Sequence, residues 1–159
     1  MKKSILLFVI INLLNPLMIK SQEKDLQSML RYSENHSLTY EEAIDFYTHL
    51  ANRYPNALLK EMGMTDAGRP LHLFIISGEK TFDPEELHRK GKTIVLINNG
   101  IHPGEPEGID ASAQFALDVL TDKDGMKKLL KNTVIAIIPV YNIGGALNRS
   151  HYFHINQNG

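Results

Sequence analysis

The sequence of 159 residues contains no cysteine, so no disulfide framework can hold the folded chain together. It also has no run of like charges, no internal repeat, no P-loop pattern and no low-complexity tract. Its 17 basic and 18 acidic residues nearly cancel, which leaves a formal net charge of −1. This balance gives no indication of a nucleic acid or an anionic membrane surface as partner. Because no disulfide can form, the mature protein must be stabilised by its core and by any metal it binds.

The chain also lacks an apolar run long enough to cross a bilayer, which takes about 20 predominantly apolar residues. Its apolar stretch at residues 5–14 follows Lys2 and Lys3 and ends near an Asn-Pro pair. A charged start followed by a short apolar run is typical of an export signal. We therefore expect residues 1–21 to be a signal peptide and the mature protein to be secreted or periplasmic, with no stable membrane span. A buried first helix is a weaker interpretation, because the run lies at the very terminus behind two lysines.

Roughly 140 residues would remain after removal of the signal, which is a usual size for one domain. Residues 22–36 are polar, and we expect a flexible lead-in there. The folded part is then residues 37–159. Its first element is a helix that begins after Thr39, because Thr39 and Glu42 form a capping box and apolar residues follow at helical spacing. Pro55 ends this helix.

Two strands are predicted next, at residues 57–65 and 71–77. A turn with glycine and proline joins them, which makes an antiparallel hairpin the expected arrangement. His72 lies in the second strand between leucines. We interpret it as a packed or edge residue, because a lone histidine in such a place is seldom a ligand. A charged connector follows, with a helix-start signal at residues 83–86.

The centre of the chain is a strand, a polar loop and a helix at residues 93–120. The continuous apolar run 93–97 is typical of a strand buried on both faces, and residues 106–120 have helical periodicity. A second apolar strand is predicted at residues 133–140. Two such strands on either side of a helix imply a parallel pair with a right-handed crossover. The expected fold class is α/β, with a mixed, mostly parallel sheet and flanking helices.

The loop of this central unit contains His102 and Glu105, in the order H-P-G-E. Imidazole and carboxylate are both ligands of Zn²⁺, and a catalytic zinc takes three protein ligands and leaves one position for water. A carboxylate at the start of a helix is also favoured by the helix dipole alone. Short motifs match by chance often, so a loop histidine beside a capping acid remains an alternative. The strand-loop-helix context favours metal ligands, because ligand sites form at such loops.

The run G-I-H-P-G-E-P-E-G after an apolar strand resembles the first zinc-binding motif of the zinc carboxypeptidase family, the carboxypeptidase A-like metallopeptidases. The family signature places its first two zinc ligands at His102 and Glu105. G-R-P-L at residues 68–71 resembles the turn between the family's first two strands. I-I-P-V-Y-N-I-G-G at residues 137–145 resembles a strand followed by an N-P-D-G loop, with isoleucine and glycine in place of Pro and Asp. The resemblance runs from about residue 37 to the end.

This resemblance implies the N-terminal part of a catalytic domain that uses zinc to remove C-terminal residues from peptides. It implies a peptide or small amide as substrate. In the family, the third zinc ligand, the glutamate that acts as general base and the arginines that bind substrate lie further downstream. We therefore expect these residues beyond Gly159, in a longer protein of which this chain is the front part. The chain alone is expected to be inactive.

Four residues near the end of the chain are further candidates for this site. Asn142 and Arg149 are weak candidates for substrate binding, because they follow a strand whose carboxyl end is at the same edge as His102. His151 and His154 are a candidate third ligand, although such a short motif is more often part of a loop. Two alternative functions remain open. One is a deacylase that acts on an amide beside a carboxylate, and the other is a non-catalytic binding module with the same fold.

Overall fold

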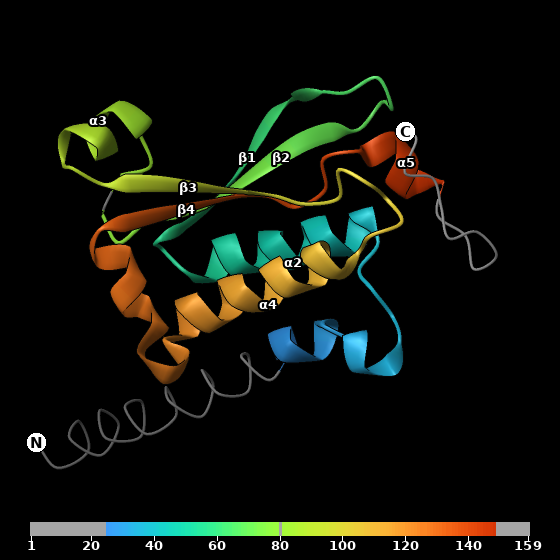
Figure 1. The fold of residues 1–159 in the computed structure, drawn as a ribbon, viewed down its shortest axis with the longest axis horizontal. Helices are drawn as coiled ribbons and strands as arrows, with labels where there is room; N and C mark the ends of the chain where they lie inside the picture. The colour runs from blue at the N-terminus through green and yellow to red at the C-terminus, as the bar shows by residue number, and fades with distance from the viewer. Residues whose placement is uncertain (1–24, 80, 149–159) are drawn as a thin grey trace, which may run out of the picture.

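The computed structural model describes residues 25–79 and 81–148, which form a four-stranded sheet with helices on its faces (Figure 1). The expected signal peptide, residues 1–21, lies outside the described residues. The strand order in the sheet is β1-β2-β4-β3. In chain order the elements are η1 (Tyr32–Glu34), α2 (Tyr40–Arg53), β1 (Ala57–Met64), β2 (Pro70–Ile76), α3 (Pro84–Arg89), β3 (Thr93–Asn98), α4 (Glu107–Thr121), η2 (Lys123–Lys131), β4 (Thr133–Ile138) and α5 (Ile143–Leu147).

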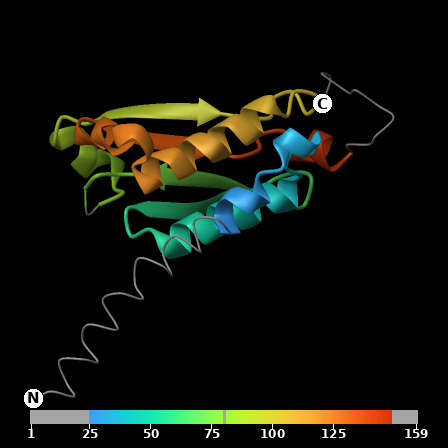
Figure 2. The ribbon, with the colours of Figure 1, turned by 90° about the horizontal axis from the view of Figure 1, so that it is seen from below.

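Helices α2 and α4 lie side by side against one face of the sheet (Figures 1 and 2). Apolar side chains from both helices and from the central strands form the main core there, because each helix has one apolar stripe to bury. Its largest members include Phe46, Tyr47, Leu50, Phe74, Ile76 and Ile137. A smaller cluster on the other face joins Leu87 of α3 to Ile75 and Val134. The sheet is therefore covered on both faces, but unequally.

The capping box predicted at the start of α2 is confirmed. Thr39 Oγ1 accepts a hydrogen bond from the Glu42 backbone N–H at 3.2 Å, and the Thr39 backbone N–H donates to Glu42 Oε2 at 2.9 Å. These two bonds satisfy donors that would otherwise have no partner at the helix start. Glu42 also lies 2.9 Å from His36 Nε2 and 3.1 Å from an Arg31 guanidinium nitrogen. One carboxylate thus joins the helix start to the segment before it.

The predicted pairings of the sheet are also confirmed. β1 and β2 form the antiparallel hairpin, and β3 and β4 are parallel, with Thr93 opposite Thr133. Helix α4 is the connection between these parallel strands. β2 pairs with β4 in the antiparallel sense, so the hairpin is joined to the parallel pair in one mixed sheet. β4 is a central strand and is buried, as its apolar sequence predicted.

The expectation that β3 is buried on both faces is wrong for the described part of the chain. β3 lies at the edge of the sheet, and Ile94, Val95 and Leu96 are 44%, 43% and 59% exposed. Among residues 25–79 and 81–148, no strand pairs with its outer edge. An apolar run shows what a strand can bury, but the neighbours that would cover it are set by the rest of the fold.

Part of the expected flexible lead-in is ordered in the structure. Residues 25–29 are helical, and Leu26 and Leu30 are buried in the main core. The two leucines are four residues apart and, together with Met29, provide only a narrow apolar stripe. That stripe was too short to stand out in the sequence. None of the helices in the described ranges is long and apolar enough to span a membrane.

Candidate metal centre

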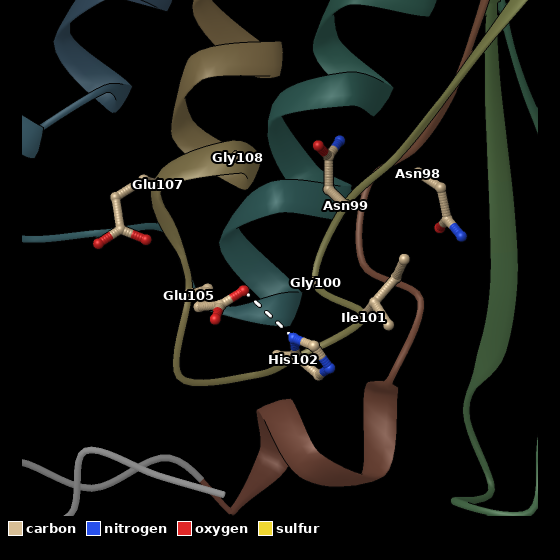
Figure 3. Close-up of a pocket in the computed structure, with 8 residues that line it drawn as sticks. All are labelled: Asn98, Asn99, Gly100, Ile101, His102, Glu105, Glu107 and Gly108. Carbon is tan, nitrogen blue, oxygen red and sulfur yellow. Dashed lines mark hydrogen bonds and ion pairs between the residues drawn. The ribbon is translucent and has the colours of Figure 1, made fainter. Parts of the chain in front are cut away.

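The loop that leaves the carboxyl end of β3 brings His102 and Glu105 together. Figure 3 shows the two side chains facing each other, with His102 Nδ1 3.2 Å from Glu105 Oε2. Both are well exposed, at 46% and 57% for their side chains. The loop turns between them because the Glu105 backbone N–H donates to the His102 carbonyl at 3.1 Å. Two potential ligand atoms are therefore held on one side of a tight turn.

This spacing fits two ligands of one zinc ion. Zinc bonds of about 2.1 Å at the tetrahedral angle place two ligand atoms about 3.4 Å apart, close to the distance observed here. The donor set also fits, because a neutral imidazole and a carboxylate are common partners in catalytic zinc sites. Within the described ranges, no group of three or more His, Cys, Asp or Glu side chains could hold a metal ion. In the part of the chain that the structure describes, the pair therefore offers two potential ligand side chains.

His102 and Glu105 line a cavity of about 440 Å³ at the end of β3 (Figure 3). Its walls come from the end of β3, the loop and the first turn of α4. The lining residues are Asn98, Asn99, Gly100, Ile101, His102, Glu105, Glu107 and Gly108. Two carboxylates and neither lysine nor arginine are among them, so the lining favours a cation.

The chain after β4 supports the loop from its other side. The Tyr141 backbone N–H donates to the Asn99 carbonyl at 2.8 Å, and the Asn142 N–H donates to the Gly100 carbonyl at 2.9 Å. The Asn142 side chain accepts from the Gly145 N–H at 2.9 Å and so caps α5, while its amide nitrogen lies 3.4 Å from the Ile101 carbonyl oxygen. Asn142 is thus next to the site, where it contacts the loop backbone.

Arg149, His151 and His154 lie outside the described residues. The sequence reasoning in turn missed Asn99, which lies directly before the loop and is only 6% exposed. Its amide contacts Ser112 of α4, and Tyr47 of α2 contacts the same hydroxyl. A polar residue after an apolar strand was the available signal, but its partners are distant in the sequence.

The sequence and the fold were compared with those of known proteins. The sequence pattern described as zinc carboxypeptidase matches residues 43–152, a range that includes the whole loop. No protein of curated function matches the chain with significant similarity. Solved structures of carboxypeptidases do resemble the chain. Their sequences are 21–23% identical to it, so the likeness establishes the fold alone.

Carboxypeptidase A from Helicoverpa armigera has a TM-score of 0.61 and 22% identity, over 82% of this chain and 33% of its own. Bovine thrombin-activatable fibrinolysis inhibitor, solved in complex with a tick carboxypeptidase inhibitor, has a TM-score of 0.56 and 21% identity, over 70% of this chain and 33% of its own. A metallo-carboxypeptidase from Burkholderia cenocepacia has a TM-score of 0.51 and 23% identity, over 63% and 26%. The chain therefore spans about a third or less of these proteins. Because the family pattern covers most of the chain and includes His102 and Glu105, the chain belongs to the zinc carboxypeptidase family.

Proposed function

We propose that the protein is an exported zinc-dependent carboxypeptidase that removes C-terminal residues from peptides, with His102 and Glu105 as two of its zinc ligands. One observation carries the proposal: the family's ligand positions lie 3.2 Å apart on one side of a turn that opens into a cavity. The family match supports peptide hydrolysis as the reaction class. Because the chain covers about a third of the solved carboxypeptidases, the activity is proposed for the complete gene product.

Each residue of the pair has a definite part in this proposal. Bound zinc would polarise the scissile carbonyl and lower the pKa of a bound water to about 7. His102 offers the imidazole nitrogen that faces Glu105, and Glu105 brings the negative charge that favours a divalent cation in the cavity. The turn closed by the Glu105 N–H and the His102 carbonyl keeps both donors on the same side. The third ligand and the general base are proposed to lie outside the described residues.

The test compares His102→Ala with a matched histidine variant. In the complete gene product, His102→Ala should lose most of its bound zinc and its peptide hydrolysis, because one coordination bond and the geometry of the site are lost. His49→Ala is the control: His49 is also exposed, lies on α2 and pairs with Asp45 of the same helix. It should keep both zinc and activity. Equal zinc content in the two variants would refute His102 as a ligand.

The 159-residue chain provides a second arm of the test. With two ligands and no general base among its described residues, it should bind zinc weakly and hydrolyse no peptide. Metal analysis and a carboxypeptidase assay on this chain decide the point. Stoichiometric zinc with turnover would show instead that residues such as His151 and His154 complete the site.

Export is the remaining part of the proposal. Lys2, Lys3 and the short apolar run support a signal peptide that is removed before about residue 22. N-terminal sequencing of the natively expressed protein tests this. A chain in the periplasm or the medium that begins near Gln22 is the expected result, and an intact Met1 on cytoplasmic material would contradict it.

A further inference from the structure

Asn99 has a buried side-chain amide and lies where the chain leaves β3. The loop that follows, residues 100–106, contains His102 and Glu105 and is called the metal loop below. Its Nδ2 donates to Ser112 Oγ at 2.7 Å and to the Ile138 carbonyl oxygen at 3.2 Å. Ile138 is the last residue of β4, and its carbonyl can only accept. This fixes which end of the Asn99 amide is the nitrogen. The side chain therefore joins the end of β3 to both β4 and α4.

The hydroxyl of Ser112 is fully used in this network. It donates to the Ile109 carbonyl at 3.1 Å, so its two acceptor positions are left for Asn99 and for the Tyr47 hydroxyl at 3.1 Å. Burial raises the pKa of Tyr47, so its hydroxyl keeps the proton that it donates. Three buried side chains from the end of β3, α4 and α2 are thus joined by hydrogen bonds. A buried network of this kind rigidifies the elements that it joins.

The two ligand candidates depend on the elements that this network joins. His102 follows Asn99 by three residues, so its place is set from the end of β3. Glu105 precedes Glu107, the first residue of α4, so its place is set from the start of that helix. The helix start also approaches Asn99 closely, since a Cβ at Gly108 would lie 3.2 Å from Asn99 Oδ1. The spacing of the ligand atoms therefore depends on how β3 and α4 are placed relative to each other.

We propose that Asn99 is a positioning residue for the metal loop: its buried amide fixes the end of β3 against α4 and so sets the spacing of His102 and Glu105. Its effect on the metal rests on the proposed zinc function, whereas its effect on the loop does not. Asn99 acts through the loop and contributes no ligand. Asparagine suits this position because one amide nitrogen offers two donors to two acceptors that are close together.

Asn99→Asp tests the amide without changing the size of the side chain. An ionised carboxylate cannot donate to the Ile138 carbonyl, so that bond is lost. Ser112→Ala removes the partner hydroxyl and leaves Asn99 in place, and alanine is well tolerated within a helix. Leu87→Ala is the control, because Leu87 packs with Ile75 and Val134 on the opposite face of the sheet. It lowers overall stability without touching the network.

The first readout is hydrogen exchange of the metal-free gene product. The amide hydrogens of Gly100, Ile101, His102, Gly104 and Glu105 should exchange about tenfold faster in the two network variants, a change equivalent to about 1.4 kcal/mol. Leu87→Ala should leave them unchanged once exchange is normalised to global stability. If the network variants behave like Leu87→Ala, Asn99 has only a structural role and the proposal is overturned. This readout stands whether or not the protein binds zinc.

The second readout is the binding and absorption spectrum of cobalt(II) as a probe of the metal site. Asn99→Asp should weaken cobalt binding by about tenfold and change the ligand-field bands, because the ligand spacing is altered. A pure charge effect has the opposite sign, since an added carboxylate would strengthen cation binding. Tighter cobalt binding by Asn99→Asp would therefore overturn the proposal. If the unaltered protein binds no cobalt, the zinc function fails, and hydrogen exchange alone decides the role of Asn99.

Discussion

Gly145 of α5 lies directly against Pro103 of the metal loop, and a Cβ at position 145 would overlap Pro103 Cγ. The proline ring is stiff and cannot rotate away, so the loop itself would have to shift. We predict that Gly145→Ala destabilises the protein by about 1–3 kcal/mol, the usual cost of overpacking. Urea denaturation measures the loss, and metal binding should weaken with it.

Gly144→Ala is the matched control for this prediction. Gly144 lies in the same short helix, but a Cβ there would be 3.7 Å from Ala67 Cβ, which is an ordinary contact. Because alanine favours a helix more than glycine does, this variant should be neutral or up to about 1 kcal/mol more stable. Equal losses in both variants would show that α5 tolerates no side chain and that Pro103 is not the cause.

Asp110 is not one of the candidate metal ligands, but we expect it to contribute to the stability of the fold. This buried carboxylate of α4 accepts a hydrogen bond from the Leu38 backbone N–H at 2.9 Å. Asp110→Ala would remove this acceptor, at a cost of about 1–3 kcal/mol. Asp110→Asn keeps an acceptor oxygen and should lose less. Chemical denaturation of both variants checks the order, and equal losses would mean that the charge rather than the hydrogen bond is decisive.

The stability contributed by Glu42 should depend on pH. Burial acts to raise the pKa of Glu42, but the hydrogen bonds from Thr39 and His36 outweigh it and hold the pKa below its usual value of 4.5. A group whose folded-state pKa is lowered adds stability above its unfolded pKa and loses it as pH falls through the folded value. Glu42→Gln should therefore be less stable than the unaltered protein at pH 7, by about 1 kcal/mol or less for so exposed a group. The difference should shrink below pH 4, and a constant difference across denaturation curves at several pH values would argue against this.

Glu105→Gln separates a metal ligand from a simple helix-capping acid. A neutral amide coordinates zinc poorly, so the variant of the complete gene product should lose most of its bound zinc. Its metal-free form should lose no more than about 1 kcal/mol, the value of an exposed charge near a helix start. Metal analysis, together with thermal melts in a chelator, gives both numbers. Normal zinc content in Glu105→Gln would leave only the capping role.

The exposed strand β3 gives a prediction that depends on what surrounds it. In the 159-residue chain, Leu96→Ala should cost under about 1 kcal/mol, since the side chain is 59% exposed, whereas Ile137→Ala in the core should cost about 2–5 kcal/mol. In the complete gene product the cost at Leu96 should rise if further chain covers β3. Urea denaturation of each variant beside its unaltered parent decides this, and an unchanged small cost at Leu96 would mean that β3 stays exposed.

Much of the fold was predictable because its signals are local. The capping box needs Thr39 and Glu42 only, the hairpin needs one turn, and the metal motif needs four consecutive residues. The errors concern features set by distant parts of the chain. The burial of β3 depends on neighbours rather than on its own apolar run, and Leu26 and Leu30 gain their place only from the core that they meet. Asn99 was missed for the same reason, since its side chain finds its partners in Ser112 and Ile138, which lie 13 and 39 positions further along the chain.

The order of strands in the sheet also has a consequence for how the protein folds. The hairpin of β1 and β2 closes a short stretch of chain, whereas the metal loop takes its supporting contacts from residues after β4, with Asn142 and Ile101 separated by 41 positions. Closing a long loop costs more chain entropy, so contacts between distant residues form late. β4 has to enter the sheet between β2 and β3 before Tyr141 and Asn142 can reach the loop. During refolding we therefore expect the hairpin to gain protection from exchange first and the loop with His102 and Glu105 last.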